Sequence, residues 1–312
     1  MTRILTSPDG TPASRLAFGT MQFGGRADET ASRAMFDAAI AGGITHFDTA
    51  YVYNEGASET LLGSFLQDQR DRLIIATKAA YTGGGSKRNI QESFAISQQR
   101  LGLDVVDILY MHRFDPDTDL HESMEALAEL KQQGRIRYIG VSNFAAWQVV
   151  KAIGIAAKFD MTVDILQPMY NLVKRQAEVE ILPMCADMDV ACAPYSPLGG
   201  GLLTGKYAAG QGGRLTEDDR YAARYGLDWM HAAAEGLSVV ATELGIDAAT
   251  LAVAWVAAHP MGPTPIISAR SAKQLAPSIA AQDFEMSPDL YARLSALSPT
   301  PPPATDRIEE QA

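Results

Sequence analysis

Four ionisable side chains follow the ends of three successive apolar runs. Asp48 ends the run 44–48 with Tyr53 close behind, Lys78 ends the run 73–78, and His112 ends the run 105–112. A phenol beside an ammonium group is suited to proton transfer, because the positive charge stabilises the phenolate and lowers the phenol's pKa from its usual value of about 10. A carboxylate would hold the ammonium in place, and an imidazole would orient a substrate oxygen atom.

Each of these residues also has an ordinary structural explanation. Asp48 could cap a loop, Tyr53 could lie on the surface, and His112 could be a hydrogen-bonded core histidine. Lys78 could be a solvated strand end, but a lysine that ends an apolar strand must reach water or a carboxylate, and Asp48 is the available partner. If the runs are neighbouring parallel strands, the four side chains meet at one end of the sheet, where α/β enzymes place their active sites.

The elements that would position these residues alternate between strand-like and helix-like segments. The strand-like segments are continuous apolar runs, as in a buried parallel sheet, and the helix-like segments carry an apolar stripe. Strands are expected at 16–18, 44–48, 73–78, 105–112, 136–142, 165–167, 190–193 and 264–267. Helices are expected at 28–40, 58–66, 89–101, 119–134, 147–156, 179–188, 229–244, 248–259, 271–281 and 289–297. Alternation with short connections predicts an α/β fold with right-handed crossovers.

Three local features depart from simple alternation. The turn sequence Ser7-Pro8-Asp9-Gly10 predicts a hairpin before the first strand. Asp119 and Glu122 have the spacing of a capping box. The connection 198–228 is long, polar and flanked by glycines, and a loop of this length in a compact domain is usually functional or disordered.

Composition excludes several classes of protein. The chain has 312 residues and a net charge of −11, without a conspicuous run of Lys and Arg, which argues against nucleic-acid or anionic-membrane partners. Cys185 and Cys192 have the spacing of neither a redox pair nor a zinc site, so we expect no disulfide framework and no metal centre. The N-terminal residues lack the apolar core of a signal peptide, and no apolar run reaches the ~18 residues of a membrane span. We therefore expect a cytoplasmic protein.

The catalytic candidates form part of a wider pattern that resembles the aldo-keto reductases. The pattern consists of Phe47-Asp48-Thr49-Ala50 with Tyr53, then Thr77-Lys78, His112-Arg113 and Gly140-Val141-Ser142-Asn143-Phe144. The resemblance runs from about Leu16 to Leu297. It implies a single (β/α)8 TIM barrel, here with an N-terminal β-hairpin and additional C-terminal helices, that binds a nicotinamide cofactor without a Rossmann domain. No G-x-G-x-x-G follows any expected strand. We expect the barrel to occupy residues 1–298 and a mobile Pro-rich tail to occupy 299–312.

The resemblance also implies a set of cofactor-binding residues. Ser142, Asn143 and Gln167 would hold the carboxamide, Tyr195 would stack on the nicotinamide, and the Gly199-Gly200-Gly201 turn would wrap the phosphates. The full set is Thr20, Met21, Asp48, Ser142, Asn143, Gln167, Tyr195, Ser196, Leu198, Gly200, Lys206, Ser268, Arg270 and Gln274.

The adenosine end of this site centres on Arg270. An arginine at a helix N-terminus combines a charge that binds two oxygens with free backbone N–H groups, which favours a 2′-phosphate and hence NADP(H), although NAD(H) is possible. The sequence departs from the family at Ser268, where Gly is usual, and at Pro277-Ser278, where a Glu-Asn pair is usual.

The expected activity is reduction of an aldehyde or ketone, or the reverse alcohol oxidation, with Tyr53 as the proton donor in reduction. The expected partner is a small-molecule carbonyl or alcohol, and aliphatic aldehydes, sugars and pyridoxal-type aldehydes all fit. Nothing in the sequence indicates an oligomeric state. Residues that could line the pocket are Met21, Phe23, Tyr81, Arg113, Tyr225 and Trp229.

Two other functions are compatible with the sequence. The family includes channel-associated subunits that bind the cofactor and turn over slowly, and this chain could be such an interaction protein. A barrel isomerase or lyase could instead use Lys78 to form a Schiff base.

Overall fold

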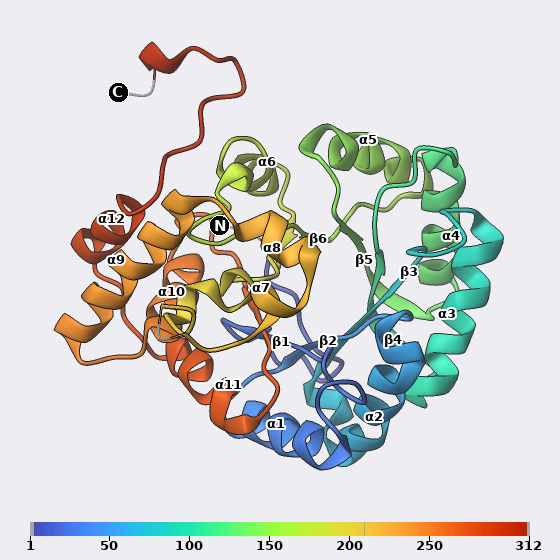
Figure 1. Ribbon diagram of the computed structural model, residues 1–312. Coiled ribbons are helices and arrows are strands. Elements are labelled where there is room, and N and C mark those ends of the chain that lie inside the picture. Colours follow the sequence, from blue (N-terminus) through green and yellow to red (C-terminus); the bar gives the residue numbers. More distant parts are fainter. Residues whose placement is uncertain (1–2, 209, 311–312) are drawn as a thin grey trace.

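Eight parallel strands form the centre of the protein, and helices surround them (Figure 1). The computed structural model describes residues 3–208 and 210–310. The strands are β1 (Ala17–Gly19), β2 (His46–Asp48), β3 (Ile74–Ala79), β4 (Val106–Met111), β5 (Ile136–Ser142), β6 (Ile165–Gln167), β7 (Ala191–Cys192) and β8 (Ile266–Ile267). Every pair of consecutive strands from β1 to β7 is hydrogen-bonded, and β1 also pairs with β8.

The sheet closes into a barrel next to β7. The Thr264 backbone N–H donates to the Cys192 carbonyl, and the Ile266 N–H donates to the Pro194 carbonyl, both at 2.8 Å. A parallel bridge between Tyr195 and Ile266 continues this contact. The predicted (β/α)8 barrel is therefore confirmed.

Two apolar clusters hold the barrel together, one on each side of the strand layer. The inner cluster fills the barrel with residues from alternate strand positions, among them Ala17, Ile74, Ile108 and Ile165. The larger outer cluster packs the other faces of the strands against the helices. Because side chains on both faces of each strand are buried, continuous apolar runs could specify the strands.

The helices cover the outside of the barrel (Figure 1). They are α1 (Glu29–Ala41), α2 (Ala57–Leu66), α3 (Lys87–Leu101), α4 (Leu120–Gln132), α5 (Ala146–Ala156), α6 (Ile181–Asp187), α7 (Arg214–Glu217), α8 (Asp219–Tyr225), α9 (Asp228–Leu244), α10 (Ala248–Ala257), α11 (Ala272–Ile279) and α12 (Pro288–Ser295). Among the described residues no single helix is long and apolar enough to cross a membrane; only α9 and α10 together pass that test, and they meet at a bend of 104°.

The start of α4 corrects one prediction. The Asp119 side chain accepts from the His121 N–H, so Asp119 caps the helix as expected. The Glu122 carboxylate does not return to Asp119, because it accepts from the Lys87 backbone N–H at 2.8 Å. Glu122 thus links α4 to the start of α3, and the predicted capping box is wrong.

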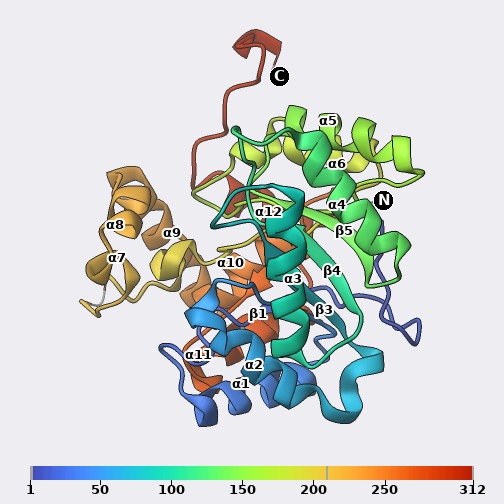
Figure 2. The same ribbon diagram turned by 90° about the vertical axis from the view of Figure 1, so that its right-hand side faces the viewer.

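The N-terminal hairpin closes the end of the barrel where the strands begin. Thr6 and Pro12 form an antiparallel bridge, and the Ser7 N–H donates to the Thr11 carbonyl at 2.8 Å. Leu5 packs into the inner apolar cluster. The predicted hairpin is present, and it lies at the opposite end of the barrel from α7 and α8 (Figure 2).

The long connection 198–228 contains short helices joined by turns and irregular segments. It contains the 3-10 segment η5 (Gly199–Thr204), followed by α7 and α8. Figure 2 shows α7 and α8 projecting beyond the C-terminal ends of the strands. The prediction of a long loop is therefore corrected at 199–204, 214–217 and 219–225, which are helical, and Ala209 lies outside the described residues.

The C-terminal tail runs away from the barrel in both views (Figures 1 and 2). Beyond α12 the described part of the tail contains a turn closed by the Asp306 N–H and the Pro303 carbonyl, and a 3-10 turn at Ile308–Glu310. The predicted tail 299–312 and the predicted barrel segment 1–298 each include terminal residues outside the described part, namely Met1, Thr2, Gln311 and Ala312.

Candidate active site

The four candidate catalytic side chains meet at the C-terminal end of the barrel. The Lys78 ammonium Nζ lies 2.5 Å from Asp48 Oδ1 and 2.8 Å from the Thr49 carbonyl oxygen. The same nitrogen lies 3.3 Å from the Tyr53 hydroxyl oxygen. The Tyr53 and His112 ring centres are 5.9 Å apart. Lys78 thus has three hydrogen-bond acceptors around its three N–H groups, and one of them is the Tyr53 hydroxyl.

Strand register explains why the sequence delivers these groups to one place. Asp48 pairs with Ala76 on β3, and Lys78 pairs with Tyr110 on β4. Lys78 lies two residues beyond Ala76, and His112 lies two residues beyond Tyr110. Side chains two residues apart lie on the same face of a strand, so all three point into the mouth of the barrel.

The loop that carries Tyr53 is fixed by its neighbour Asn54. Asn54 has a φ of 48°, in the left-handed region that Asn tolerates better than most residues. Its side-chain amide donates to the carbonyls of Met21 at 2.9 Å and Phe23 at 2.7 Å. These bonds tie the Tyr53 loop to the loop after β1 and hold the phenol at the rim.

The pKa values of Lys78 and Tyr53 both lie above their usual ranges, for different reasons. Burial lowers the pKa of Lys78, but attraction to Asp48 and the hydrogen bonds outweigh it, so the pKa of Lys78 lies above its usual range. Burial raises the pKa of Tyr53 more than the Lys78 charge lowers it. The expectation that Lys78 would bring the Tyr53 pKa below its usual value is therefore wrong for this structure; Tyr53 keeps its proton at neutral pH.

His112 is buried and uncharged. Burial, together with the nearby Lys78 and Arg113 charges, lowers the pKa of His112 to about 3. Its Nδ1 is buried without a hydrogen-bond partner among the described residues. The Tyr81 ring centre lies 4.8 Å from that of His112. At neutral pH His112 is thus a neutral imidazole that carries one N–H donor.

A chain of polar side chains links Asp48 to the predicted carboxamide-binding residues. Gln167 Nε2 donates to Asp48 Oδ2 at 2.8 Å, and Ser142 Oγ donates to the Gln167 carbonyl at 3.0 Å. Asn143 Nδ2 donates to Ser142 Oγ at 3.1 Å, and the Tyr195 hydroxyl donates to Asn143 Oδ1 at 2.7 Å. The structure therefore brings these residues together at the same rim as the four candidate catalytic side chains.

The predicted phosphate-binding arginine holds a carboxylate in this structure. Glu217 Oε2 on α7 accepts from Arg270 Nη2 at 3.1 Å and from Arg26 Nη1 at 2.9 Å. The Ser268 hydroxyl, just after β8, is buried without a partner among the described residues. Two guanidinium groups that already share one anion, beside an unpaired hydroxyl, fit the phosphate groups of a nicotinamide cofactor.

The other predicted cofactor residues lie at the same end of the barrel. The Thr20 hydroxyl is buried and bonds to Ser58 Oγ at 2.8 Å, so it braces the rim. At Gly200, φ is +66° and an added Cβ would lie 2.8 Å from the Tyr221 ring, so glycine is required. Gln274 Oε1 accepts from the Arg270 backbone N–H at 3.3 Å. The remaining four are half-buried: Met21, Ser196, Leu198 and Lys206.

Two of the six predicted pocket residues belong to the core. Phe23 is fully buried, with ring centres 5.6 Å from Phe18 and 5.9 Å from Phe65. Tyr225 is also buried, and its hydroxyl accepts from Asn171 Nδ2 at 3.3 Å. The other four are half-buried or exposed: Met21, Tyr81, Arg113 and Trp229.

Sequence reasoning missed Tyr221 and Glu217. The guanidinium carbons of Arg214 and Arg224 lie 5.1 Å and 5.3 Å from the centre of the Tyr221 ring. The only sequence signal is the concentration of Arg and Tyr between 214 and 225, which fixes no geometry by itself.

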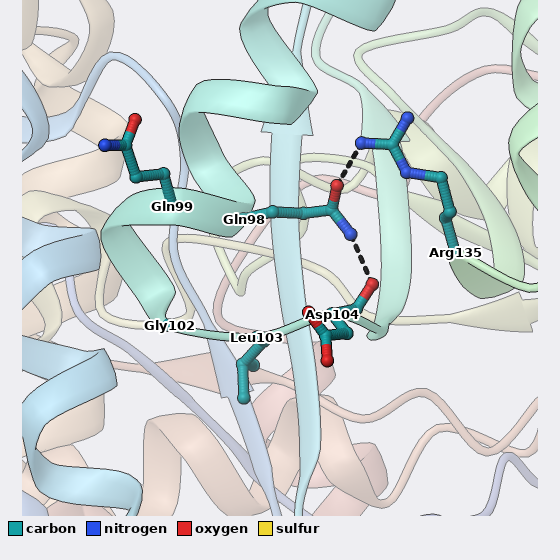
Figure 3. Close-up of a pocket in the computed structure, with 6 residues that line it drawn as sticks. All are labelled: Gln98, Gln99, Gly102, Leu103, Asp104 and Arg135. Carbon is teal, nitrogen blue, oxygen red and sulfur yellow. Dashed lines mark hydrogen bonds between the residues drawn. The ribbon is translucent and has the colours of Figure 1, made fainter.

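A separate surface pocket lies at the far end of the barrel, where α3 ends and β4 begins (Figure 3). The Gln98 side chain bonds to the Arg135 guanidinium and to the Asp104 carbonyl, so these groups satisfy one another. None of the predicted catalytic or cofactor residues lines this pocket.

Comparisons with known proteins point to one family. The sequence model described as "Aldo/keto reductase family" matches residues 15–299. An uncharacterized oxidoreductase of Bacillus subtilis is 34% identical, over 94% of this chain and 94% of its own. A probable voltage-gated potassium channel subunit beta of Oryza sativa is 31% identical, over 95% of this chain and 96% of its own. Human aflatoxin B1 aldehyde reductase member 2 is 36% identical, over 63% of this chain and 57% of its own.

Proposed function

Because the chain belongs to the aldo/keto reductase family, an oxidoreductase family, we propose that it reduces aldehydes or ketones with NADPH, or oxidises the corresponding alcohols with NADP⁺. The observation that carries the proposal is the position of Lys78 Nζ between Asp48 Oδ1 and the Tyr53 hydroxyl. When bound, the nicotinamide supplies or accepts the hydride at the carbonyl carbon.

Tyr53 supplies the proton in the reductive direction. Its raised pKa keeps the hydroxyl protonated at neutral pH, so a donor is present when negative charge develops on the carbonyl oxygen. Lys78 then stabilises the phenolate that Tyr53 becomes, and Asp48 holds Lys78 in position. His112 donates one N–H to the carbonyl oxygen without adding a charge.

The residues of the rim would hold the cofactor in a defined orientation. The amides and hydroxyls of Ser142, Asn143 and Gln167 offer the donors and acceptors that a carboxamide needs. Arg270 and Ser268 follow β8, where the adenosine phosphate would bind, and β7 separates β8 from the strand that carries Gln167. The two groups are therefore set apart around the rim, which supports an extended cofactor laid across the mouth.

A carbonyl and alcohol panel tests the proposal. Purified protein is mixed with NADPH or NADH and aliphatic, aromatic and sugar aldehydes, and oxidation of the cofactor is followed by nicotinamide absorbance. We expect multiple turnovers with at least one aldehyde and a preference for NADPH. Cofactor binding without turnover of any carbonyl or alcohol would count against the enzymatic proposal.

A cofactor-binding interaction subunit is the second candidate, because a relative named as a potassium channel subunit beta matches nearly the whole chain. Such a protein would oxidise its bound NADPH once, slowly, and retain the product. Single-turnover and steady-state rates measured on the same preparation separate the two candidates.

The Schiff-base alternative is disfavoured by the site. A lysine nucleophile must be unprotonated, but the pKa of Lys78 is raised and its N–H groups are taken up by Asp48, Thr49 and Tyr53.

A further inference from the structure

Arg113 follows His112 directly, and the proposed proton-transfer mechanism does not use it. Its side chain is exposed, and among residues 3–208 and 210–310 it has neither a carboxylate within ion-pair distance nor a side-chain hydrogen bond. Most other arginines in this acidic chain are paired with carboxylates, as Arg175 is with Glu178 and Arg100 with Glu59. An arginine without an ion pair at the mouth of the site is therefore conspicuous.

The position of the Arg113 guanidinium is set by stacking. Its central carbon lies 4.9 Å from the Tyr81 ring centre, and the Tyr81 ring in turn lies 4.8 Å from the His112 ring. A guanidinium that stacks on a tyrosine face keeps its N–H edge free for a ligand. The Tyr81 ring therefore lies between the Arg113 guanidinium and the His112 imidazole, which would orient the substrate carbonyl.

The nearby carboxylate of Asp115 attracts the Arg113 charge but forms no ion pair with it. Asp115 Oδ2 accepts from the Gly85 N–H at 2.7 Å and from the Thr118 hydroxyl at 2.6 Å, and its Oδ1 accepts from the Asp117 N–H at 3.1 Å. Asp115 therefore shapes its own loop, and the Arg113 charge remains available.

The connection after β7 contributes two more arginines without an ion pair among the described residues, although its acidic and basic residues balance in number. Arg214 and Arg224 both stack on Tyr221, and neither has a carboxylate within ion-pair distance in the described part of the chain. A protein with a net charge of −11 thus keeps several uncompensated arginines at this one end.

Resting on the proposed carbonyl reductase function, we infer that the substrate carries an anionic group, a carboxylate or a phosphate, which the Arg113 guanidinium binds while Tyr53 and His112 receive the carbonyl oxygen. Planar guanidinium groups bind either anion through two parallel N–H···O bonds. Arg113 is thus a specificity-determining residue.

Matched pairs of aldehydes test this inference. One pair is 4-carboxybenzaldehyde and methyl 4-formylbenzoate, and the other is glycolaldehyde phosphate and glycolaldehyde. Rates with NADPH are compared in the wild type, Arg113→Ala, Arg113→Lys and a control, Arg72→Ala, which removes an exposed arginine from the opposite end of the barrel. The two pairs show whether the anion is a carboxylate or a phosphate.

We expect the wild type and Arg72→Ala to prefer the charged member of at least one pair. Arg113→Ala should lose roughly 10- to 150-fold in kcat/KM for that member, mainly through a higher KM, with little change for its neutral partner. Arg113→Lys should retain part of the preference, and added salt should weaken it. Equal kcat/KM within both pairs, or a preference that survives in Arg113→Ala, would overturn the inference. Turnover of none of the four aldehydes would instead count against the proposed function.

Discussion

Two buried carboxylates, one at each end of the barrel, are paired with cations in different ways. At the N-terminal end, Asp107 accepts from Arg137 at 2.8 Å and from the Ile75 N–H at 2.8 Å, and it forms an ion pair with Arg70 at 2.8 Å. At the C-terminal end, Asp48 accepts from Lys78 and from Gln167. Both carboxylates are almost inaccessible to solvent.

The two ion pairs differ in the other groups that Arg137 and Lys78 contact. Arg137 also donates to the carbonyls of Thr6 and Ser7, so this cluster joins the hairpin to the barrel. Lys78 instead bonds to the Tyr53 hydroxyl, and Tyr53 is half-buried at the open mouth. In the proposed mechanism, a buried ion pair thus serves stability at one end of the barrel and proton transfer at the other, according to the second group that the cation contacts.

Replacing Lys78 should have the largest effect, because it breaks the buried Asp48–Lys78 ion pair and also removes the cation beside Tyr53. Lys78→Met leaves Asp48 buried without its cation, which should cost about 3–5 kcal/mol of unfolding free energy and abolish measurable turnover. Denaturant unfolding and steady-state rates check this. The double variant Asp48→Asn/Lys78→Met should regain much of the stability and none of the activity. If Lys78→Met is as stable as the wild type, the pair is not a buried one.

Replacing Tyr53 should affect chemistry alone. Tyr53→Phe should lower kcat by roughly 10²- to 10⁴-fold, the usual contribution of a positioned acid, while NADPH binding and unfolding midpoints stay near wild type. Tyr138→Phe is the matched control, because it removes a half-buried tyrosine hydroxyl that bonds to Thr6 at the other end of the barrel. Wild-type turnover in Tyr53→Phe would sink the proposed mechanism.

Replacing Asp107 should lower stability and leave the catalytic rate unchanged. Asp107→Ala leaves Arg70 and Arg137 without their carboxylate, but both arginines reach solvent, so the loss of unfolding free energy should be near the lower limit for a broken buried pair, about 3 kcal/mol. The kcat of the folded fraction should not change. A large fall in kcat with normal stability would mean that the two ends are not separate in function.

Replacing Arg270 should give the smallest effect, confined to the cofactor. Hydrogen bonds to a charged group contribute about 1.5–3 kcal/mol, so Arg270→Ala should weaken NADPH binding by roughly 10- to 150-fold and leave NADH binding nearly unchanged. Glu217→Gln is the matched control, because it loosens the same contact with α7 but keeps the guanidinium, so NADPH binding should not weaken. Equal losses for both cofactors in Arg270→Ala would mean that Arg270 only holds α7 in place.

The barrel and the meeting of Asp48 with Lys78 could be predicted because each depends on local pattern. Lys78 and Asp48 end apolar runs, and the parallel register then brings them together. The loop geometry could not be predicted in the same way. The spacing of Asp119 and Glu122 suggests a local hydrogen bond within α4. The Glu122 carboxylate instead accepts from the Lys87 backbone N–H, because α3 packs against α4.

The aromatic residues and the Tyr53 pKa depend on three-dimensional burial. Phe23 lies in the loop after β1 and Tyr225 ends α8, both at the end of the barrel where pocket residues are expected, but the two rings are buried among apolar neighbours. The Tyr53 pKa depends on two opposing effects, the Lys78 charge and the loss of solvent, and the sequence names only the first. The pairing of Glu217 with Arg26 and Arg270 joins three distant segments, so no local motif encodes it.

The seam of the barrel, where β7 meets β8, is formed by its two shortest strands. β4 and β5 span six and seven residues, whereas β7 and β8 span two each, so few ladder hydrogen bonds close the ring on that side. Amide hydrogens of Ile266 and Thr264 should therefore exchange with solvent sooner than those of β4, because local opening needs fewer bonds broken. Residues proposed to bind the cofactor lie on both edges of the seam, Tyr195 after β7 and Arg270 after β8. A bound cofactor would bridge these edges and slow exchange there more than elsewhere.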